Sequence, residues 1–142
     1  MDDALQALYR AIRTTLSAAT ESWGPSGSGS RCYADLAPAG APPPYVVFFV
    51  LAGGEINASV RQDAEFVLLV KCIVEEDMPT ALAIAARLSA LLNDQDAGAL
   101  AAGDDWTIIN ISQEQRVHYV EQVDGRLLHH SGHRFRVRME SL

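Results

Sequence analysis

The segment Pro42-Pro-Pro-Tyr-Val-Val-Phe-Phe-Val-Leu51 limits the possible fold of this chain more than any other stretch. Each of its prolines lacks an amide donor and has a fixed φ, so they can form neither helix nor central strand. The chain therefore stays extended as it enters Tyr45–Leu51, where every residue is apolar, aromatic or β-branched. Such a short apolar run, followed by Gly53 and Gly54, predicts a strand that begins the sheet and is buried on both faces.

A length of 142 residues predicts one domain, residues 1–142, with a hydrophobic core that needs no crosslinks. No stretch resembles a signal peptide, and no apolar run reaches the roughly 20 residues of a membrane span. We therefore expect a soluble, intracellular chain without a membrane partner. Cys32 and Cys72 could form a disulfide, but without an export signal two reduced thiols are expected.

The net charge of −7 is unevenly distributed along the chain. Residues 1–114 carry six Lys and Arg against fifteen Asp and Glu, whereas residues 115–142 carry five against three. An acidic body argues against general affinity for nucleic acid, because binding to phosphates requires a basic surface. It is compatible with a surface that DNA passes without adhering.

Two amphipathic helices are predicted. Residues 3–18 carry a stripe of apolar side chains at helical spacing. We expect Trp23-Gly-Pro to end this helix and Ser26–Ser30 to form a flexible tether. The second helix begins at the N-cap Asp77, tolerates Pro79 in its first turn and ends near Asn93. The stripe of the first helix consists of Leu5, Leu8, Tyr9, Ile12 and Leu16.

Five further segments have strand or loop character. Cys32–Leu36 could form a short strand, and Ala64–Glu75 predicts a long one. Between Leu51 and Ala64 we expect an exposed, mobile loop, Ala52–Asp63, that is suited to docking. Strands are also predicted over Trp106–Ser112 and Arg116–Val123, separated by Gln113–Gln115. The candidate docking residues of the loop are Gly53, Gly54, Glu55, Asn57 and Arg61.

Asp124-Gly125 is a turn signal, and His133–Glu140 alternates strictly between basic and apolar residues. The order of elements predicts an α+β fold: a mainly antiparallel sheet of four to five strands, with two helices packed on one face. The residues expected to be largely buried are Val47, Phe49, Phe66, Leu68, Val70, Leu88, Leu91, Phe135 and Val137.

Two clusters could carry function. His129 or His130 together with His133, and a carboxylate such as Asp124, could share a metal ion. A zinc site needs three or four protein ligands, however, and no Cys or Glu stands at supporting spacing, so loop histidines are the favoured interpretation. Nucleophile and phosphate-binding signatures are also missing, so the sequence predicts neither an enzyme nor a cofactor.

The second cluster is a cationic stripe on one side of the last strand, formed by Arg134, Arg136 and Arg138. It could face an acidic partner or DNA phosphates, or it could be a solvated surface balanced by acidic neighbours. Sequence alone slightly favours the balanced surface.

The chain resembles the small tail-completion, or tail-terminator, proteins of long-tailed bacteriophages, a family also present in phage-like gene transfer agents. The resemblance spans most of the chain in the right order. Its most specific parts are the proline-tyrosine entry into the first strand, within Ala37–Phe48, and the ending Gly132–Arg138. The first helix over Ala4–Ile12 and the alanine-rich helix over Ala81–Leu92 also match.

The resemblance implies a structural, non-enzymatic role. Family members form a ring, commonly of six copies, at the head-proximal end of the virion tail, after assembly in the host cytoplasm. The ring ends polymerisation of the tail-tube protein and meets the head-tail connector or stopper, and DNA passes through its lumen only as cargo. A ring requires contacts between two different faces of each copy. Expected interface residues are Arg134, Arg136 and Arg138 against Glu75, Glu76, Asp104 and Asp105.

Two alternatives remain open at this stage. A neck or head-completion adaptor, or a tail-tube subunit, would have a similar small α+β fold, but a tube subunit polymerises without limit. A small metal-dependent enzyme or ligand-binding domain would use the histidine cluster, which metal analysis of untagged protein would test.

Overall fold

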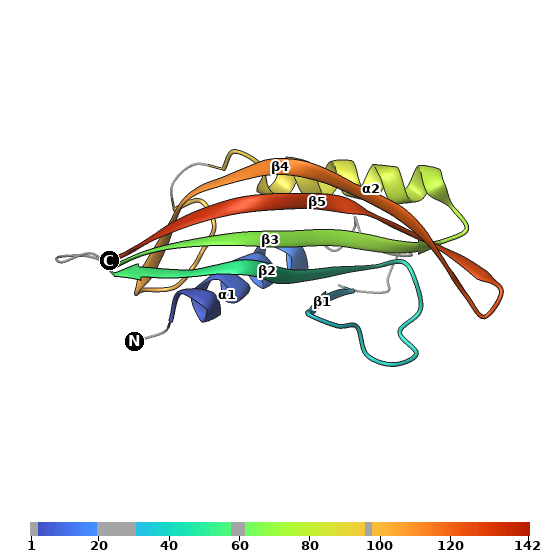
Figure 1. Ribbon diagram of the computed structural model, residues 1–142, viewed down its shortest axis with the longest axis horizontal. Coiled ribbons are helices and arrows are strands. Elements are labelled where there is room, and N and C mark those ends of the chain that lie inside the picture. The colour runs from blue at the N-terminus through green and yellow to red at the C-terminus, as the bar shows by residue number, and fades with distance from the viewer. Residues whose placement is uncertain (1–2, 20–30, 58–61, 96–97) are drawn as a thin grey trace.

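The computed structural model describes residues 3–19, 31–57, 62–95 and 98–142. Within these ranges the chain forms one five-stranded sheet in the order β1-β2-β3-β5-β4 (Figure 1). The strand β1 runs parallel to β2, and every other neighbouring pair is antiparallel. The elements are α1 (Ala4–Ser17), β1 (Cys32–Ala34), β2 (Tyr45–Asn57), β3 (Gln62–Glu75), α2 (Met78–Leu92), β4 (Trp106–Val123) and β5 (Arg126–Ser141).

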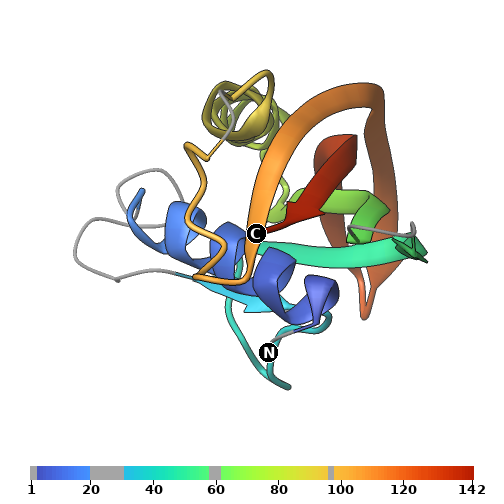
Figure 2. The ribbon, with the colours of Figure 1, turned by 90° about the vertical axis from the view of Figure 1, so that its left-hand side faces the viewer.

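Both helices lie on the same side of the sheet (Figure 2), which confirms the predicted α+β architecture. A single buried cluster joins the apolar stripes of α1 and α2 to one face of the strands. We call this the helix face, and the opposite surface of the sheet the open face. Side chains alternate along each strand, so the helix face receives Phe48, Leu68, Val70, Phe135 and Val137.

Each helix begins where the sequence predicts. The Asp3 carboxylate accepts a hydrogen bond from the Gln6 amide at 2.8 Å, and the Gln6 side chain accepts one from the Asp3 amide at 3.2 Å. This capping box satisfies amides that the helix itself leaves unpaired. At α2, Asp77 accepts from the Thr80 amide at 3.1 Å. Leu5 departs from the predicted stripe, because its side chain is 42% exposed.

The open face corrects the expectation that Tyr45–Leu51 is buried on both sides. Val46 and Phe48 are fully buried under the helices, but Leu51 is 50% exposed. Of the nine predicted core residues, seven are buried, whereas Phe49 and Leu91 are half-buried. Phe49 pairs with Leu69 on the open face, which no helix among the described residues covers.

The prediction of a mobile loop over Ala52–Asp63 is wrong for most of this range. Ala52–Asn57 continues β2 and pairs with Gln62–Val67 of β3, after a bulge between Val50 and Ala52. Gly53 has a φ of +123°, and a Cβ there would lie 2.2 Å from the Glu65 carbonyl oxygen. This glycine therefore permits close approach of two strands, a role that composition alone does not separate from a loop. Arg61 and the predicted tether lie outside the described residues.

Two other boundaries differ from the prediction. Gln113–Gln115 does not separate two strands, because β4 is continuous through these residues. Its pairing with β5 shifts register between Gln113 and Gln115, as at a β-bulge. The last strand begins at Arg126 instead of His133, so the predicted loop histidines belong to β5. The Asp124-Gly125 turn is confirmed, since Val123 pairs with Arg126 across it.

Candidate interaction surface

The three arginines of the predicted cationic stripe lie on the open face of β5, beside acidic residues of both neighbouring strands. Arg136 donates to Glu114 of β4, and its Nη1 lies 2.5 Å from Glu65 of β3. These hydrogen bonds, first that to Glu114, raise the pKa of Arg136. Arg134 lies 4.0 Å from Glu114. The stripe is thus balanced largely within the chain, like the solvated surface that the sequence slightly favoured.

Arg138 completes this arrangement, with its Nη2 3.9 Å from the Asp63 carboxylate. The alternation of β5 explains why the arginines gather, because every second residue points away from the helices. The register explains their partners, since Val67 of β3 and Ser112 of β4 flank Arg136 on either side. An interface role for these arginines therefore stays a prediction.

The structure separates the predicted acidic interface residues into two groups. Glu75 is the last residue of β3, where it pairs with Leu128, and Glu76 follows it directly. Asp104 and Asp105 precede β4 at the opposite end of the sheet, where Trp106 pairs with Ser141. Glu75 accepts two hydrogen bonds of 2.8 and 2.9 Å from Arg126, and these bonds lower the pKa of its carboxyl group.

The histidine cluster does not converge on one point. His133 lies on the helix face, where its Nε2 donates to the Ala85 carbonyl at 2.7 Å. His130 lies on the open face, stacked on Tyr119 at 4.4 Å with its Nε2 3.2 Å from Glu121. Burial lowers the pKa of both rings. Among the described residues no group of three or more His, Cys, Asp and Glu side chains is placed to hold a metal ion.

The sequence did not reveal a pocket of about 430 Å³ on the open face. Its floor comes from β2 and β3, and its wall is the connection that follows β1. Leu36 stands at this wall with 84% of its side chain exposed. Sequence patterning cannot predict this pocket, because the pocket forms only when the connection after β1 folds back onto the sheet. Apolar lining residues are Leu36, Tyr45, Val47, Phe49 and Ile73, beside Lys71 and His130.

The end of the β4–β5 hairpin forms a second feature that sequence patterning missed. Residues 119–128, which we call the arm, extend past the start of β2 at one end of the molecule (Figure 1). Tyr119, Val120, Val123 and Leu127 of the arm are between 39% and 50% exposed. Exposed apolar groups on both faces of a projecting hairpin are typical of a contact surface. The sequence predicted only a strand over Arg116–Val123 and a turn at Asp124-Gly125 in this region.

Comparison with solved structures identifies chains with the same fold. A chain from the virion of a native gene transfer agent particle aligns over 97% of this chain and 95% of its own length. The TM-score is 0.63 and the sequence identity is 19%. The two chains share a fold.

A second solved structure, whose name carries no functional description, covers 96% of this chain and 94% of its own, with a TM-score of 0.55 and 14% identity. No protein-family model matches the chain, and no curated protein does. In the part of the chain that the structure describes, no helix is long and apolar enough to cross a membrane.

Proposed function

We propose that this chain is a structural virion protein, a tail terminator that closes into a ring at the head-proximal end of a tail tube. The observation that carries the proposal is the likeness in fold, over nearly the whole of both chains, to a component of a gene transfer agent virion. The resemblance of the proline-tyrosine entry and the last strand to tail-completion proteins supports the same class. The ring would contain about six copies, as the resemblance implies.

The surface features support a role in assembly. The open face presents an apolar pocket, and the arm presents exposed apolar side chains. Contacts with neighbouring proteins would bury both. Ion pairs within the chain balance the arginines of the open face, so DNA would pass such a ring without strong attachment. The proposed partners are further copies, the tail-tube protein and the head-tail connector or stopper, and we propose no catalytic activity.

Two measurements test this function. Light scattering after size exclusion, with negative-stain images, should show closed rings that do not grow with protein concentration. Purified tail-tube protein from the same particle should then stop elongating, and the ring should be seen at one end of each tube. Open fibres of unlimited length would instead indicate a tail-tube subunit.

A neck or head-completion adaptor is the second candidate, and the same open face and arm would serve it. Such an adaptor would bind the portal end of filled heads in the absence of tails. A terminator should bind tubes in the absence of heads. Pull-down of purified heads and purified tubes by the ring therefore separates the two functions.

A further inference from the structure

The first half of the outer edge of β4 is capped by the chain itself. The Asp94 amide donates to the Ile111 carbonyl at 2.8 Å. The Asn93 side chain accepts from the Gln113 amide at 2.7 Å. The connection after α2 thus satisfies backbone groups that an edge strand would otherwise present to water. This protection ends at Gln113, where the register of β4 with β5 shifts.

Beyond this shift, the tight turn at the end of β4 determines which backbone groups point outward. Asp124 and Gly125 have φ angles of 51° and 77°, as in the two-residue turns of hairpins. Residues that flank such a turn exchange both hydrogen bonds, so Val123 and Arg126 pair inward. The register is regular from there back to Gln115, so every second residue directs its amide and carbonyl away from β5. These residues are Arg116, His118, Val120 and Gln122.

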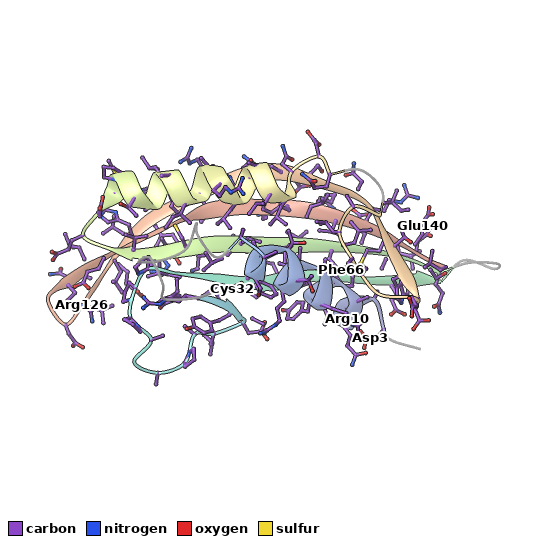
Figure 3. All side chains as sticks on the ribbon, turned by 180° about the vertical axis from the view of Figure 1, so that it is seen from behind. Asp3, Arg10, Cys32, Phe66, Arg126 and Glu140 are labelled. Carbon is purple, nitrogen blue, oxygen red and sulfur yellow. The ribbon has the colours of Figure 1, made fainter. Side chains whose placement is uncertain are left out.

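No described residue forms a hydrogen bond with these outward groups. We call residues 116–122 the free edge; as extended chain it is about 20 Å long. The side chains of the four outward residues are all exposed, so neither helix covers the free edge. Figure 3 shows Arg126, just past the turn, at the opposite end of the molecule from Glu140, so the free edge leads to one end of the molecule.

Side chains on both sides of the free edge are placed to hold an added strand. Tyr119 is 43% exposed on the open face, and Val120 is 50% exposed on the other side. The Tyr119 ring is already fixed in the unbound chain, because Lys71 donates to its hydroxyl at 2.5 Å and His130 stacks on it. An anchor that is ordered in advance loses little conformational entropy on binding.

The charges of the free edge differ between its two ends. Arg116 is exposed at one end and makes no hydrogen bond or ion pair with any described residue. Glu121 lies near the other end, with a side chain 51% exposed, and contacts the His130 ring at 3.2 Å. Burial lowers the pKa of His130, so this ring is neutral near pH 7 and does not balance the charge of Glu121. A complementary strand would carry a carboxylate beside Arg116 and a cation beside Glu121.

We propose that the free edge binds an extended segment of another virion protein, which pairs with β4 as a further strand of the sheet. The outward amides and carbonyls supply the main-chain hydrogen bonds, and side chains on both faces give specificity. The bound segment has apolar residues beside Tyr119 and Val120, a carboxylate beside Arg116 and a basic residue beside Glu121. This inference rests on the proposed role in virion assembly, and it states how the chain holds its partner.

A second copy of the chain fits the free edge less well. Two copies joined through their free edges would make a two-fold contact that closes at a dimer, whereas the proposed ring requires two different faces of each copy. The other edge of the sheet offers less open backbone, because β1, the Tyr9 hydroxyl and the first amide of α1 already contact β2 there.

Proline at an outward position tests the pairing. Proline at His118 or Val120 removes an amide donor that β5 does not use, so the fold should be retained. His118→Pro and Val120→Pro should each weaken binding to purified tail tubes from the same particle, measured by co-sedimentation, by about tenfold or more. His118→Ala and Val120→Ala keep the donor, so their binding should stay within a few-fold of the original protein. Thermal unfolding of all four variants separates loss of binding from loss of fold.

Hydrogen exchange resolved to single residues gives a readout that docking through side chains alone would not give. In the unbound chain the four outward amides should exchange rapidly, whereas the amides of Val117, Tyr119 and Glu121 are bonded to β5 and protected. In the complex with tubes, the outward amides should become protected as well. Unchanged exchange at these four amides, in a complex that forms, overturns strand addition.

Arg116→Gln tests the carboxylate expected in the bound segment. Loss of this cation should weaken binding to tubes by about threefold or more, and high salt should reduce the difference. Ala86→Glu, on the exposed side of α2, changes the net charge by the same amount away from the free edge and should leave binding unchanged. Equal binding of the two variants overturns the proposed charge of the partner.

The outcomes separate strand addition from the proposed function. If every variant caps tubes like the original protein, strand addition is overturned while the terminator stands. If the protein binds purified heads instead of tubes, and the proline variants lose that binding, strand addition stands and the adaptor replaces the terminator. Loss of self-association in folded proline variants would assign the free edge to a second copy and overturn the proposed occupant. A chain that binds neither tubes nor heads overturns both the inference and the function.

Discussion

Burial of single side chains divides the predicted core into two groups. Phe135 is fully buried beneath the helices, whereas Phe49 points to the open face and is half-buried. Both occupy strands of high apolar content, and their sequence surroundings do not separate them. What separates them is which face the helices cover, and this follows from tertiary packing. Sequence thus predicted the strand containing Phe49 but not its exposed side.

Phe135→Ala and Phe49→Ala make a matched test of this difference. Removing the Phe135 ring should lower the free energy of unfolding by about 3–5 kcal/mol, because a cavity remains in a closely packed core. The loss at Phe49 should be clearly smaller, since solvent already reaches that ring. Urea denaturation of both variants measures the two losses. Equal losses would contradict the assignment of one covered and one open face.

Gly53 allows a similar comparison with its neighbour. A methyl group at Gly53 would meet the Glu65 carbonyl at 2.2 Å in a backbone conformation that side chains disfavour. Gly53→Ala should therefore lower the free energy of unfolding by about 2–4 kcal/mol. Gly54→Ala is the control, because nothing lies within 4 Å of its Cβ position. Equal losses of free energy of unfolding in the two variants would contradict the close approach of β2 and β3 at Gly53.

His133 makes stability depend on pH. Burial lowers the pKa of this ring in the folded state, so the unfolded chain takes up the proton more readily. The contribution of this histidine to the free energy of unfolding should then be complete above the unfolded pKa of about 6.5. It should decrease as the pH falls below that value. The slope should approach about 1.4 kcal/mol per pH unit for this histidine.

Burial, and after it the charge of Lys71, also lowers the pKa of His130. This ring therefore adds to the loss of stability at low pH. Urea denaturation between about pH 7.5 and 5 should show a shallower slope in His133→Gln than in the original chain. Ala86→Gln, at an exposed position of α2, removes no titratable group and is the control that should keep the original slope. An unchanged slope in the His133 variant would contradict a buried neutral ring.

At the scale of elements, local chemistry predicted helix boundaries better than interruptions of strands. Asp77 and Pro79 marked the start of α2, because an N-cap acts within one turn. The polar segment Gln113–Gln115 looked like a break, yet strand pairing with β5 carries the ladder through it. Similarly, Gly53 and Gly54 suggested a loop until β3 was aligned beside them. Whether a strand continues through such a segment depends on its pairing partner, which is distant in sequence. The periodicity of one segment carries no information about that partner.

The cap of α2 gives a prediction at this scale. Asp77→Ala should lower the free energy of unfolding by about 0.5–2 kcal/mol, because the Thr80 amide loses its acceptor. Asp77→Ser retains an acceptor of suitable length and should lose little by comparison. Thermal unfolding followed by circular dichroism measures both. Equal losses in the two variants would show that the carboxylate acts by its charge and not as a cap.

At the scale of the whole molecule, the sequence predicted the layer arrangement but not the surfaces available for assembly. The amphipathic character of α1 and α2 favoured helices against one side of a sheet, as found. The pocket combines a connection and two strands, and the arm depends on how far β4 and β5 extend beyond β2. Neither is a property of any single segment.

The arginines of the open face test whether the cationic stripe joins copies of the chain. Arg136 already contacts Glu114 and Glu65, and Arg138 lies 3.9 Å from Asp63. Exposed ion pairs of this kind contribute about 0–1 kcal/mol each to folding, so R136Q/R138Q should unfold at nearly the original denaturant concentration. Because these arginines already bind carboxylates of the same chain, light scattering should also find the oligomer of this variant intact. Dissociation of a folded R136Q/R138Q protein would place the cationic stripe between copies, as expected from the resemblance to ring-forming proteins.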